Sequence, residues 1–534
     1  MNPPIKNSLF ILSIVSLLLL GCNNATKKEA PNQKEFVLLE KTISELQELM
    51  TSGDLSSEQI THLYIDRIEK IDRGKSGLNA VIELNPEALD IARKLDTERA
   101  EGDTRGPLHG IPVLIKDNID TGDKMSTSAG SIALKDSKAE NDAFIVSKLR
   151  EAGAVLLGKT NLSEWANFRS FRSSSGWSSR GGQTKNPYYL DRNPCGSSSG
   201  SGVAVSANLC AIAIGTETNG SIVCPSSVNG VVGIKPTVGL WSRSGIIPIS
   251  ETQDTAGPMA RTVTDAVILL GELLGSDPRD SISFESVGRA FDDYTQFLDK
   301  NGMKDKRIGV LREKFGINEK VDSIMNRSIR TMKEHGAIII DSVEIAIGEN
   351  YDGMAFSLLQ YEFKDGLNKY LQNLKGGTIK SLEELIAFNE ENREMCMPYF
   401  EQEILKLSEE KSGLDSKEYQ DILESMLTMS RKDGLVATLD RYQLDAIVAP
   451  TNNPSWPIDL LNGDKYDIYS SSPAARSGYP NITVPAGNVQ GLPVGISFFS
   501  RAYEEPKLIS MAFAFEQATH ARIVPKMLET FAPE

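Results

Sequence analysis

The sequence predicts an α/β protein built around one large, buried sheet. Short apolar runs bounded by glycine recur along the chain, and stretches with apolar residues at helical spacing lie between them. Continuous apolar runs are typical of strands whose sheet is covered on both faces. Helices that alternate with such strands supply the cover, so the two observations together indicate the α/β class.

Helices and strands alternate through the first half of the chain. Phe36–Asp72 carries apolar residues at helical spacing, with Ser57 as a candidate cap. Pro86–Arg99 has a proline in the first turn of an expected helix. Strands are expected at Leu78–Glu83, Ile111–Ile115, Ala154–Leu157 and Ala211–Ile214.

In the second half of the chain the composition changes before further strands are expected. Residues 341–440 are charged and helix-favouring, which predicts a helical insertion or layer. Apolar runs that favour strands follow at 445–450, 481–485 and 493–499. Because no repeat and no strong linker follow residue 36, residues 37–534 are expected to form a single domain.

The first residues have the pattern of a targeting signal. Leu9–Leu20 is an apolar run of twelve residues, and Cys22 follows it after one glycine. That run is too short to span a bilayer, which needs ~20 residues. The pattern is typical of a bacterial lipoprotein signal over residues 1–21, with a lipid on Cys22 and a polar tether over 22–36. A plain cleaved secretion signal is the alternative; the expected location is the bacterial cell envelope, exported and anchored in a membrane.

Composition excludes several classes of protein. Hydrophobic residues make up 40% of the chain, as in ordinary globular proteins, and a net charge of −15 argues against a nucleic-acid partner. The chain has neither a CxxC nor a HExxH motif, so no metal and no cofactor are expected. Four cysteines besides Cys22 could pair, but their irregular spacing favours small packing residues: Cys195, Cys210, Cys224 and Cys396.

Two familiar motifs occur in an unsuitable context. Gly153–Thr160 matches the phosphate-loop pattern, but its interior is an apolar run that favours a buried strand over a turning loop. Gly196–Gly200 matches the GxSxG pattern around Ser198, but polar sequence precedes it where a buried strand is required. His109 is the histidine nearest to the motifs, and a structural role is expected for it. Nucleotide binding and a Ser-His-Asp triad are therefore disfavoured.

Three other residues form a consistent catalytic set. Lys116 is flanked by apolar residues, while Ser197 and Ser221 stand in two glycine-rich segments that bracket the apolar stretch Val203–Ile214. Such segments allow the backbone to pack closely around a substrate carbonyl and to present N–H donors to an oxyanion. A lysine with two serines can hydrolyse amides without a histidine.

The blocks that hold these residues resemble the amidase signature family of Ser-cisSer-Lys amide hydrolases. The resemblance runs from about Leu55 to Arg261 and returns at Pro480–Phe499. It implies a large mixed central β-sheet covered by helices on both faces. The blocks are Gly110–Asn118, Gly158–Trp165, Cys195–Gly202, Gly215–Ile222, Gly230–Pro236 and Asp254–Arg261.

The resemblance also implies roles for the residues. Ser221 matches the nucleophile, Ser197 the relay that follows a cis peptide bond, and Lys116 the base. Burial would keep Lys116 neutral and able to accept a proton. The oxyanion donors would be the backbone N–H groups of Thr218, Asn219, Gly220 and Ser221.

Departures from the family pattern indicate a branch. Cys195 and Glu217 stand where the family often has glycine and aspartate, and these variants look most like the peptide amidase branch. The expected partner is therefore a small-molecule or peptide amide, with C-terminal peptide amides as one candidate; protein partners are not indicated. A broad-specificity or fatty-acyl amidase is the alternative. A non-catalytic binding lipoprotein and an amidotransferase subunit are less favoured.

Overall fold

The structure is a computed structural model that describes residues 36–74 and 77–532. Its contacts divide the chain after Leu39, and Glu40–Glu534 forms one compact unit. Every helix and strand of the described residues lies within Glu40–Glu534. The expected signal over residues 1–21, Cys22 and nearly all of the expected tether lie outside the described residues.

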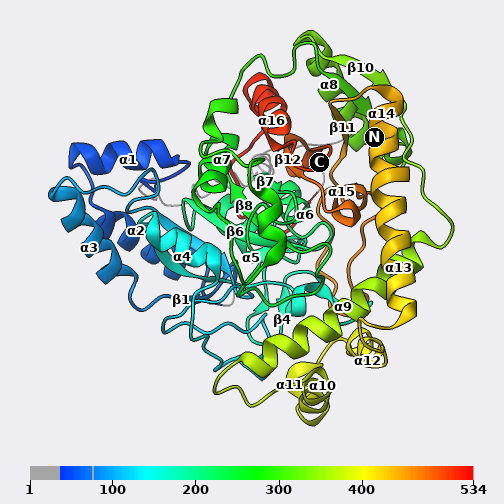
Figure 1. Ribbon diagram of the computed structural model, residues 1–534. Helices are drawn as coiled ribbons and strands as arrows, with labels where there is room; N and C mark the ends of the chain where they lie inside the picture. Colours follow the sequence, from blue (N-terminus) through cyan, green and yellow to red (C-terminus); the bar gives the residue numbers. More distant parts are fainter. Residues whose placement is uncertain (1–35, 75–76, 533–534) are drawn as a thin grey trace, which may run out of the picture. The chain divides into compact units, whose positions relative to one another are not determined.

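A mixed sheet of 11 strands forms the centre of this unit (Figure 1), in the order β1-β3-β2-β6-β8-β7-β12-β13-β11-β9-β10. β2 runs parallel to β3 and β6, and β9 runs parallel to β10 and β11; the other neighbours are antiparallel. The strands are β1 Val81–Leu84, β2 Pro112–Lys116, β3 Val155–Thr160, β6 Ile212–Glu217, β7 Val232–Lys235, β8 Thr255–Ala260, β9 Arg307–Val310, β10 Ile338–Asp341, β11 Ala446–Pro450, β12 Asn481–Val489 and β13 Leu492–Phe499. A separate hairpin pairs β4 Trp177–Ser178 with β5 Gly182–Gln183.

Helices cover both faces of the sheet, which confirms the predicted fold class. α5 and α6 contact each other and pack on strands at its centre, while α7 and α16 form a second such pair. Thr42 and Ser56 cap α1 and α2, so Ser56 caps the helix for which Ser57 was the predicted cap. These helices are α1 Ile43–Ser52, α2 Ser57–Ile71, α3 Ala88–Ala100, α4 Phe144–Glu151, α5 Ser199–Ser206, α6 Val223–Val228, α7 Val263–Glu272, α8 Glu319–Glu334, α15 Ser472–Ser477 and α16 Glu505–Thr519.

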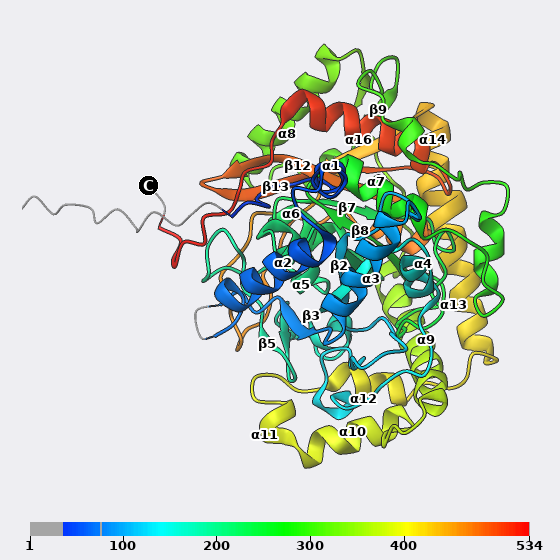
Figure 2. The same ribbon diagram turned by 90° about the vertical axis from the view of Figure 1, so that its left-hand side faces the viewer.

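The expected helical region is present as a layer of its own. α9 to α12 lie together below the sheet in both views (Figures 1 and 2), and α13 leads into a π-helix and α14 without a break. Apolar side chains of α9 pack on the segments around Trp165 and Ile249. The elements are α9 Tyr351–Asn373, α10 Leu382–Glu391, α11 Arg393–Cys396, α12 Glu403–Glu409, α13 Lys417–Leu427, the π-helix Thr428–Val436 and α14 Ala437–Tyr442.

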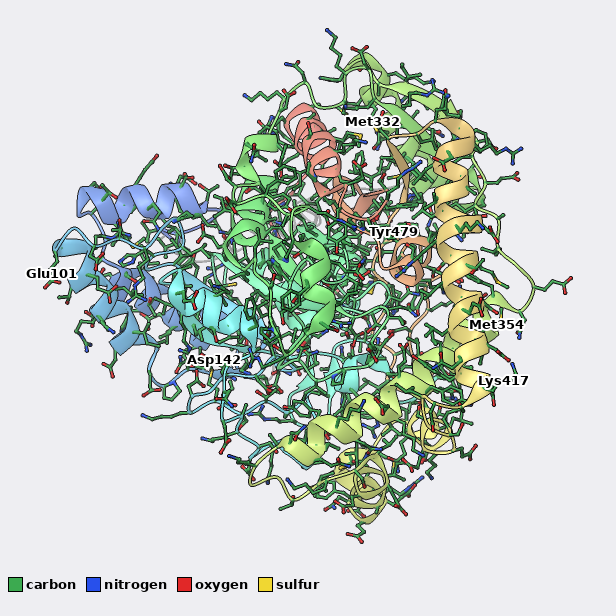
Figure 3. The ribbon with its side chains drawn as sticks, viewed as in Figure 1. Glu101, Asp142, Met332, Met354, Lys417 and Tyr479 are labelled. Carbon is green, nitrogen blue, oxygen red and sulfur yellow. A yellow bond between two sulfur atoms is a disulfide. The ribbon has the colours of Figure 1, made fainter. Side chains whose placement is uncertain are left out.

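Side chains separate by polarity as expected for a protein in water. Figure 3 shows Glu101 and Lys417 pointing outward, whereas Met332 of α8 is fully buried. Across residues 36–74 and 77–532, no helix has both the length and the apolar character needed to cross a membrane.

Candidate active site

The candidate residues gather at one edge of the sheet. β2 ends at Lys116 and its parallel neighbour β6 ends at Glu217, so the segments that leave these strands start side by side. Ser221 follows β6 on a short loop, and Ser197 precedes α5, which packs on both strands. The fold thus brings Lys116, Ser197 and Ser221 to one edge.

Lys116 is fully buried, and among the described residues its amine is hydrogen-bonded to neutral oxygens alone. Its Nζ lies 2.8 Å from Ser197 Oγ, 2.8 Å from Thr216 Oγ1 and 3.2 Å from the Thr216 carbonyl oxygen. Burial lowers the pKa of Lys116 to about 7, while the negative charges of Asp254 and Glu217 act in the opposite direction. A large fraction of the amine is therefore neutral near pH 7.

Ser197 is held by its backbone. The Gly196–Ser197 peptide bond is cis, and the Ser197 carbonyl accepts a hydrogen bond from the backbone N–H of Ser163. A Cβ on Gly196 would lie 2.2 Å from Ser163 Oγ, so only glycine fits there. The side chain of Ser197 is fully buried, and Lys116 is its neighbour at 2.8 Å.

Ser221 is the most accessible member of the trio, with 9% of its surface exposed. Glu217 Oε2 accepts hydrogen bonds from the backbone N–H groups of Ile222 and Val223, which fixes the turn directly after Ser221. Within the described ranges, no group accepts a hydrogen bond from the backbone N–H of any residue from Thr218 to Ser221. Four donors therefore remain available around the candidate nucleophile.

A disulfide joins the two serine segments. Cys195, two residues before Ser197, is bonded to Cys224, three residues after Ser221, with the Cα atoms 6.0 Å apart. The prediction that these two cysteines are packing residues is wrong, because the fold brings together segments that the spacing kept apart. Cys210 and Cys396 are free and buried, as expected.

The disfavoured motifs have structural roles. Gly158 and Lys159 lie within the buried strand β3, and the Lys159 ammonium donates to Ile119 O and Thr127 Oγ1. The hydroxyl of Ser198 donates to the Thr216 carbonyl and accepts from the Thr216 N–H, so it links α5 to β6. His109 is buried with Nε2 2.9 Å from the Leu95 carbonyl oxygen. In the described residues no group of three or more His, Cys, Asp or Glu side chains is arranged to hold a metal ion.

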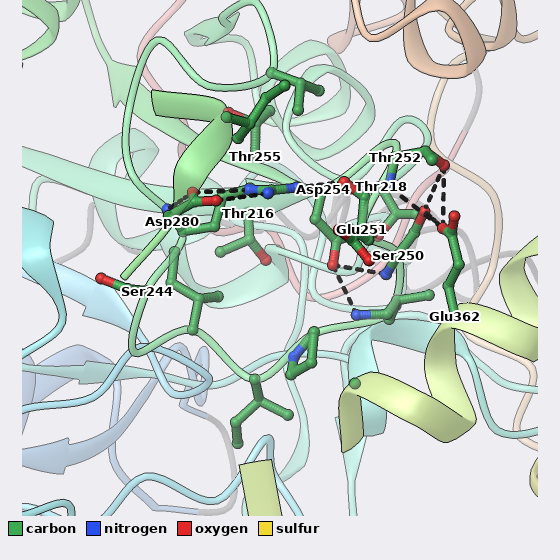
Figure 4. Close-up of a pocket in the computed structure, with 18 of the residues that line it drawn as sticks. Thr216, Thr218, Ser244, Ser250, Glu251, Thr252, Asp254, Thr255, Asp280 and Glu362 are labelled. Carbon is green, nitrogen blue, oxygen red and sulfur yellow. Dashed lines mark hydrogen bonds and ion pairs between the residues drawn. The ribbon is translucent and has the colours of Figure 1, made fainter. Parts of the chain in front are cut away.

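A cavity of about 1220 Å³ adjoins the site. Thr216, which is bonded to Lys116, and Thr218, which precedes Ser221 on the same loop, both line it. Figure 4 shows Thr216, Asp254 and Glu362 along its wall. The cavity is large enough for a small ligand of peptide size.

The sequence did not indicate how three further residues support the trio. Thr216 and Glu217 lie in the Gly215–Ile222 block, and Asp254 opens the Asp254–Arg261 block, but these blocks carry no information on hydrogen-bond partners. Their roles depend on which atoms meet across β2, β6 and β8.

Similar proteins share this fold over nearly the whole chain. A probable amidase from Arabidopsis thaliana is 44% identical over 504 residues, which cover 92% of this chain and 93% of the relative. A putative amidase from Schizosaccharomyces pombe is 37% identical, with 94% and 89% covered. The structure of a peptide amidase from Stenotrophomonas maltophilia has 48% identity and a TM-score of 0.88 over 92% of this chain and 99% of that one.

The predicted location in a bacterial envelope is wrong. The relatives that match nearly the whole chain include amidases of a plant and a fungus, organisms that do not make bacterial lipoproteins. A short apolar run before a cysteine is weaker evidence for the location of a protein than similarity to relatives over the full length. The anchor through Cys22 is therefore not retained.

The family assignment rests on most of the chain. The amidase family model matches residues 59–509, a range that contains the whole sheet and all three candidate catalytic residues. Full-length relatives and peptide amidase structures agree with that match. The chain belongs to the amidase family and is an amide-hydrolysing enzyme.

Proposed function

We propose that the protein hydrolyses primary carboxamides to acid and ammonia through an acyl-enzyme on Ser221, with Ser197 as relay and Lys116 as base. The observation that supports this most is the buried Lys116 amine, 2.8 Å from Ser197 Oγ. A lysine in this environment loses its proton near neutral pH. A neutral amine at that distance can accept the proton of the serine.

Thr216 would orient the base. A neutral lysine amine has two N–H bonds and one lone pair, and two Thr216 oxygens lie within hydrogen-bond distance of Nζ. If both N–H groups donate to Thr216, the lone pair faces Ser197. Asn118 Nδ2 donates to the same Thr216 hydroxyl oxygen at 3.1 Å, which holds the threonine in place. This arrangement does for the lysine what a buried carboxylate does for a catalytic histidine.

The reaction then proceeds by proton relay. Lys116 takes the proton of Ser197, Ser197 takes that of Ser221, and the Ser221 oxygen bonds to the amide carbon. The oxyanion is met by the backbone N–H groups at Thr218, Asn219, Gly220 and Ser221, which have no other acceptor in the described residues. Collapse breaks the C–N bond, and Ser197 returns a proton so that ammonia leaves. Water, deprotonated by the same relay, releases the acid and frees Ser221.

Peptide C-terminal amides are the proposed substrates. The similar structures include a peptide amidase in complex with the competitive inhibitor chymostatin, at 48% identity, over 92% of this chain and 100% of that one. The cavity beside Thr216 and Thr218 provides room for more than a small aliphatic amide.

A panel of amides tests the proposal. Ammonia release would be measured from an amidated dipeptide, a short aliphatic amide and a long-chain acyl amide, with the wild type and Ser221→Ala. Fastest turnover of the peptide amide, lost in Ser221→Ala, supports it. Ser226→Ala is a matched control, because Ser226 lies on the adjacent α6 and its buried hydroxyl has no hydrogen-bond partner in the part of the chain that the structure describes. Faster turnover of the long-chain amide would contradict peptide amides as the substrates and favour a fatty-acyl amidase. Full activity of Ser221→Ala would refute the mechanism.

A further inference from the structure

Asp254 lies directly opposite the oxyanion loop. The last pair in the ladder between β6 and β8 is Glu217 with Thr255, so Thr218 and Asp254 face each other one step beyond it. Thr218 Oγ1 donates a hydrogen bond of 2.5 Å to Asp254 Oδ1. Thr218 is the first of the four residues around Ser221 whose backbone N–H groups meet no acceptor among the described residues. One carboxylate oxygen therefore holds the beginning of that loop.

The other carboxylate oxygen holds the wall of the cavity. Asp254 Oδ2 accepts hydrogen bonds from the backbone N–H groups of Ile249 at 2.7 Å and Ser250 at 2.8 Å. Three donors thus converge on one carboxylate, which belongs to the residue directly before β8. Because two of them are backbone groups, the carboxylate has one position in which all three are satisfied.

The cavity wall is anchored in turn to the helical layer. Glu362 of α9 accepts hydrogen bonds from the hydroxyls of Ser250 and Thr252, the second at 3.0 Å, and from Tyr419 of α13 at 3.1 Å. Figure 4 shows Asp254, Ser250 and Glu362 in sequence along the wall. Asp254 therefore joins the oxyanion loop to a wall that two helices hold in place through Glu362. Such support is what accurate placement of a neighbouring group requires.

Asp254 also acts on the proposed base through its charge. It is the larger of the two negative influences on Lys116, ahead of Glu217, and both raise the pKa of the amine against the effect of burial. Removing the charge at position 254 leaves Glu217 as the counter-charge. The ammonium form of Lys116 is then less stable, and its pKa falls further.

We infer that Asp254 is a positioning residue for the reaction: its carboxylate holds Thr218, and with it the N–H donors from Thr218 to Ser221, against the cavity wall. The inference rests on the proposed function, because these donors matter only if an oxyanion forms beside Ser221. Misplacement of such donors lowers the rate of the chemical step more than it weakens substrate binding.

The test compares two substitutions at Thr218. Thr218→Val removes the hydroxyl and keeps the shape, and it is expected to lower kcat by about 10- to 100-fold with little change in KM. Thr218→Ser keeps the hydroxyl and should recover most of the loss. Thr97→Val on the exposed surface of α3 is the matched control. The inference is overturned if Thr218→Val keeps the kcat of the wild type, or if Thr218→Ser is equally impaired.

The pH dependence of kcat/KM distinguishes the effect of the Asp254 charge on Lys116 from the effect of Thr218 on the oxyanion donors. Asp254→Asn should move the acidic limb of kcat/KM to lower pH, because Lys116 loses a counter-charge. Thr218→Val should leave that limb in place. If Thr218→Val does not fold, kcat of Asp254→Asn on the plateau above the limb decides in its place: a plateau lowered with little change in KM supports the inference, and a plateau equal to that of the wild type overturns it. A wild type that hydrolyses no amide refutes the proposed function, whereas an active wild type with an equally active Thr218→Val refutes only the role of Asp254.

Discussion

Lys116 is a buried amine surrounded by neutral oxygens. Its pKa of about 7 means that the amine is neutral above that pH and protonated below it. Only the neutral form can accept the proton of Ser197, so activity should rise as pH increases through 7. We expect the acidic limb of kcat/KM to have an apparent pKa near 7, measured by ammonia release between pH 5 and 9 at constant ionic strength.

Substitution of Lys116 provides the complement to this profile. Lys116→Met keeps the length and the apolar stem but has no proton acceptor, and kcat should fall by about 10²- to 10⁴-fold. Lys159→Met is the contrasting variant, since Lys159 is equally buried but donates only to groups outside the site. A limb near pH 10 in the wild type, or an active Lys116→Met, would contradict the role of this residue.

Thr216 is the second residue on which the base depends. Thr216→Val removes one of the two oxygens that receive the amine protons, and kcat should fall by about tenfold while KM changes little. Thr216→Ser should keep most of the activity. Equal kcat values for Thr216→Val and the wild type would show that the lysine is oriented without this hydroxyl.

The roles of single residues divide into those visible in the sequence and those that depend on tertiary contacts. Lys116, Ser197 and Ser221 stand in motifs, and the resemblance of these motifs to those of a family implied a role for each residue. Thr216 and Asp254 act through hydrogen bonds between strands that are distant in sequence. No local pattern predicts such contacts, because they depend on the order of strands in the sheet.

At the scale of elements, the disulfide joins the two segments that carry the serines. The double variant Cys195→Ser, Cys224→Ser should lower the free energy of unfolding by about 3 to 4 kcal/mol. This is the free energy expected from the loop-closure entropy of a disulfide that closes a loop of about 30 residues. Urea denaturation with and without reductant measures it. Reductant should destabilise the wild type and leave the double variant unchanged; a wild type that is indifferent to reductant would contradict this prediction.

α5 shows how glycine can belong to a helix. The run from Gly196 to Gly202 is rich in glycine and serine, residues that favour loops, but its second half is the first turn of α5. A Cβ on Gly200 would lie 2.3 Å from the Ala80 carbonyl oxygen, so close packing outweighs the poor helix propensity of glycine. Helix propensity alone does not predict that a helix begins within this run.

Substitution at Gly200 tests that explanation. Gly200→Ala should destabilise the protein by at least about 2 kcal/mol, because the backbone of Ala80 cannot move aside without disturbing the sheet. Gly271→Ala in α7, where the nearest atoms are 3.8 Å from the added Cβ, should be neutral or stabilising by up to about 1 kcal/mol. Thermal unfolding of both variants measures the difference, and equal stability would contradict the packing argument.

The strands were predictable to different degrees. Predicted strands overlap β1, β2, β3, β6, β11, β12 and β13, with bounds that differ by up to a few residues. β7 and β8 were not predicted, because they contain Gly233, Gly257 and Pro258, residues that usually mark turns. They lie inside the sheet, where neighbouring strands supply pairing that the local sequence does not indicate.

At the scale of the molecule, the sheet and the helical layer contribute different parts of the site. The sheet sets the positions of the candidate catalytic residues, and the layer from α9 to α14 supplies one wall of the cavity through Glu362 and Tyr419. The sequence of this layer contains no recognised motif, so its contribution to substrate choice could not be predicted. The extent of a single domain over residues 37–534 stays a prediction.

The central claim is that amide hydrolysis passes through a covalent acyl group on Ser221. Acid quenching during turnover of an amidated peptide, followed by peptide mass spectrometry, tests it most directly. We predict an acyl mass on Ser221 that appears only with substrate and is absent in Ser221→Ala. An acyl group on another residue, or undiminished turnover by Ser221→Ala with no adduct, would contradict the account.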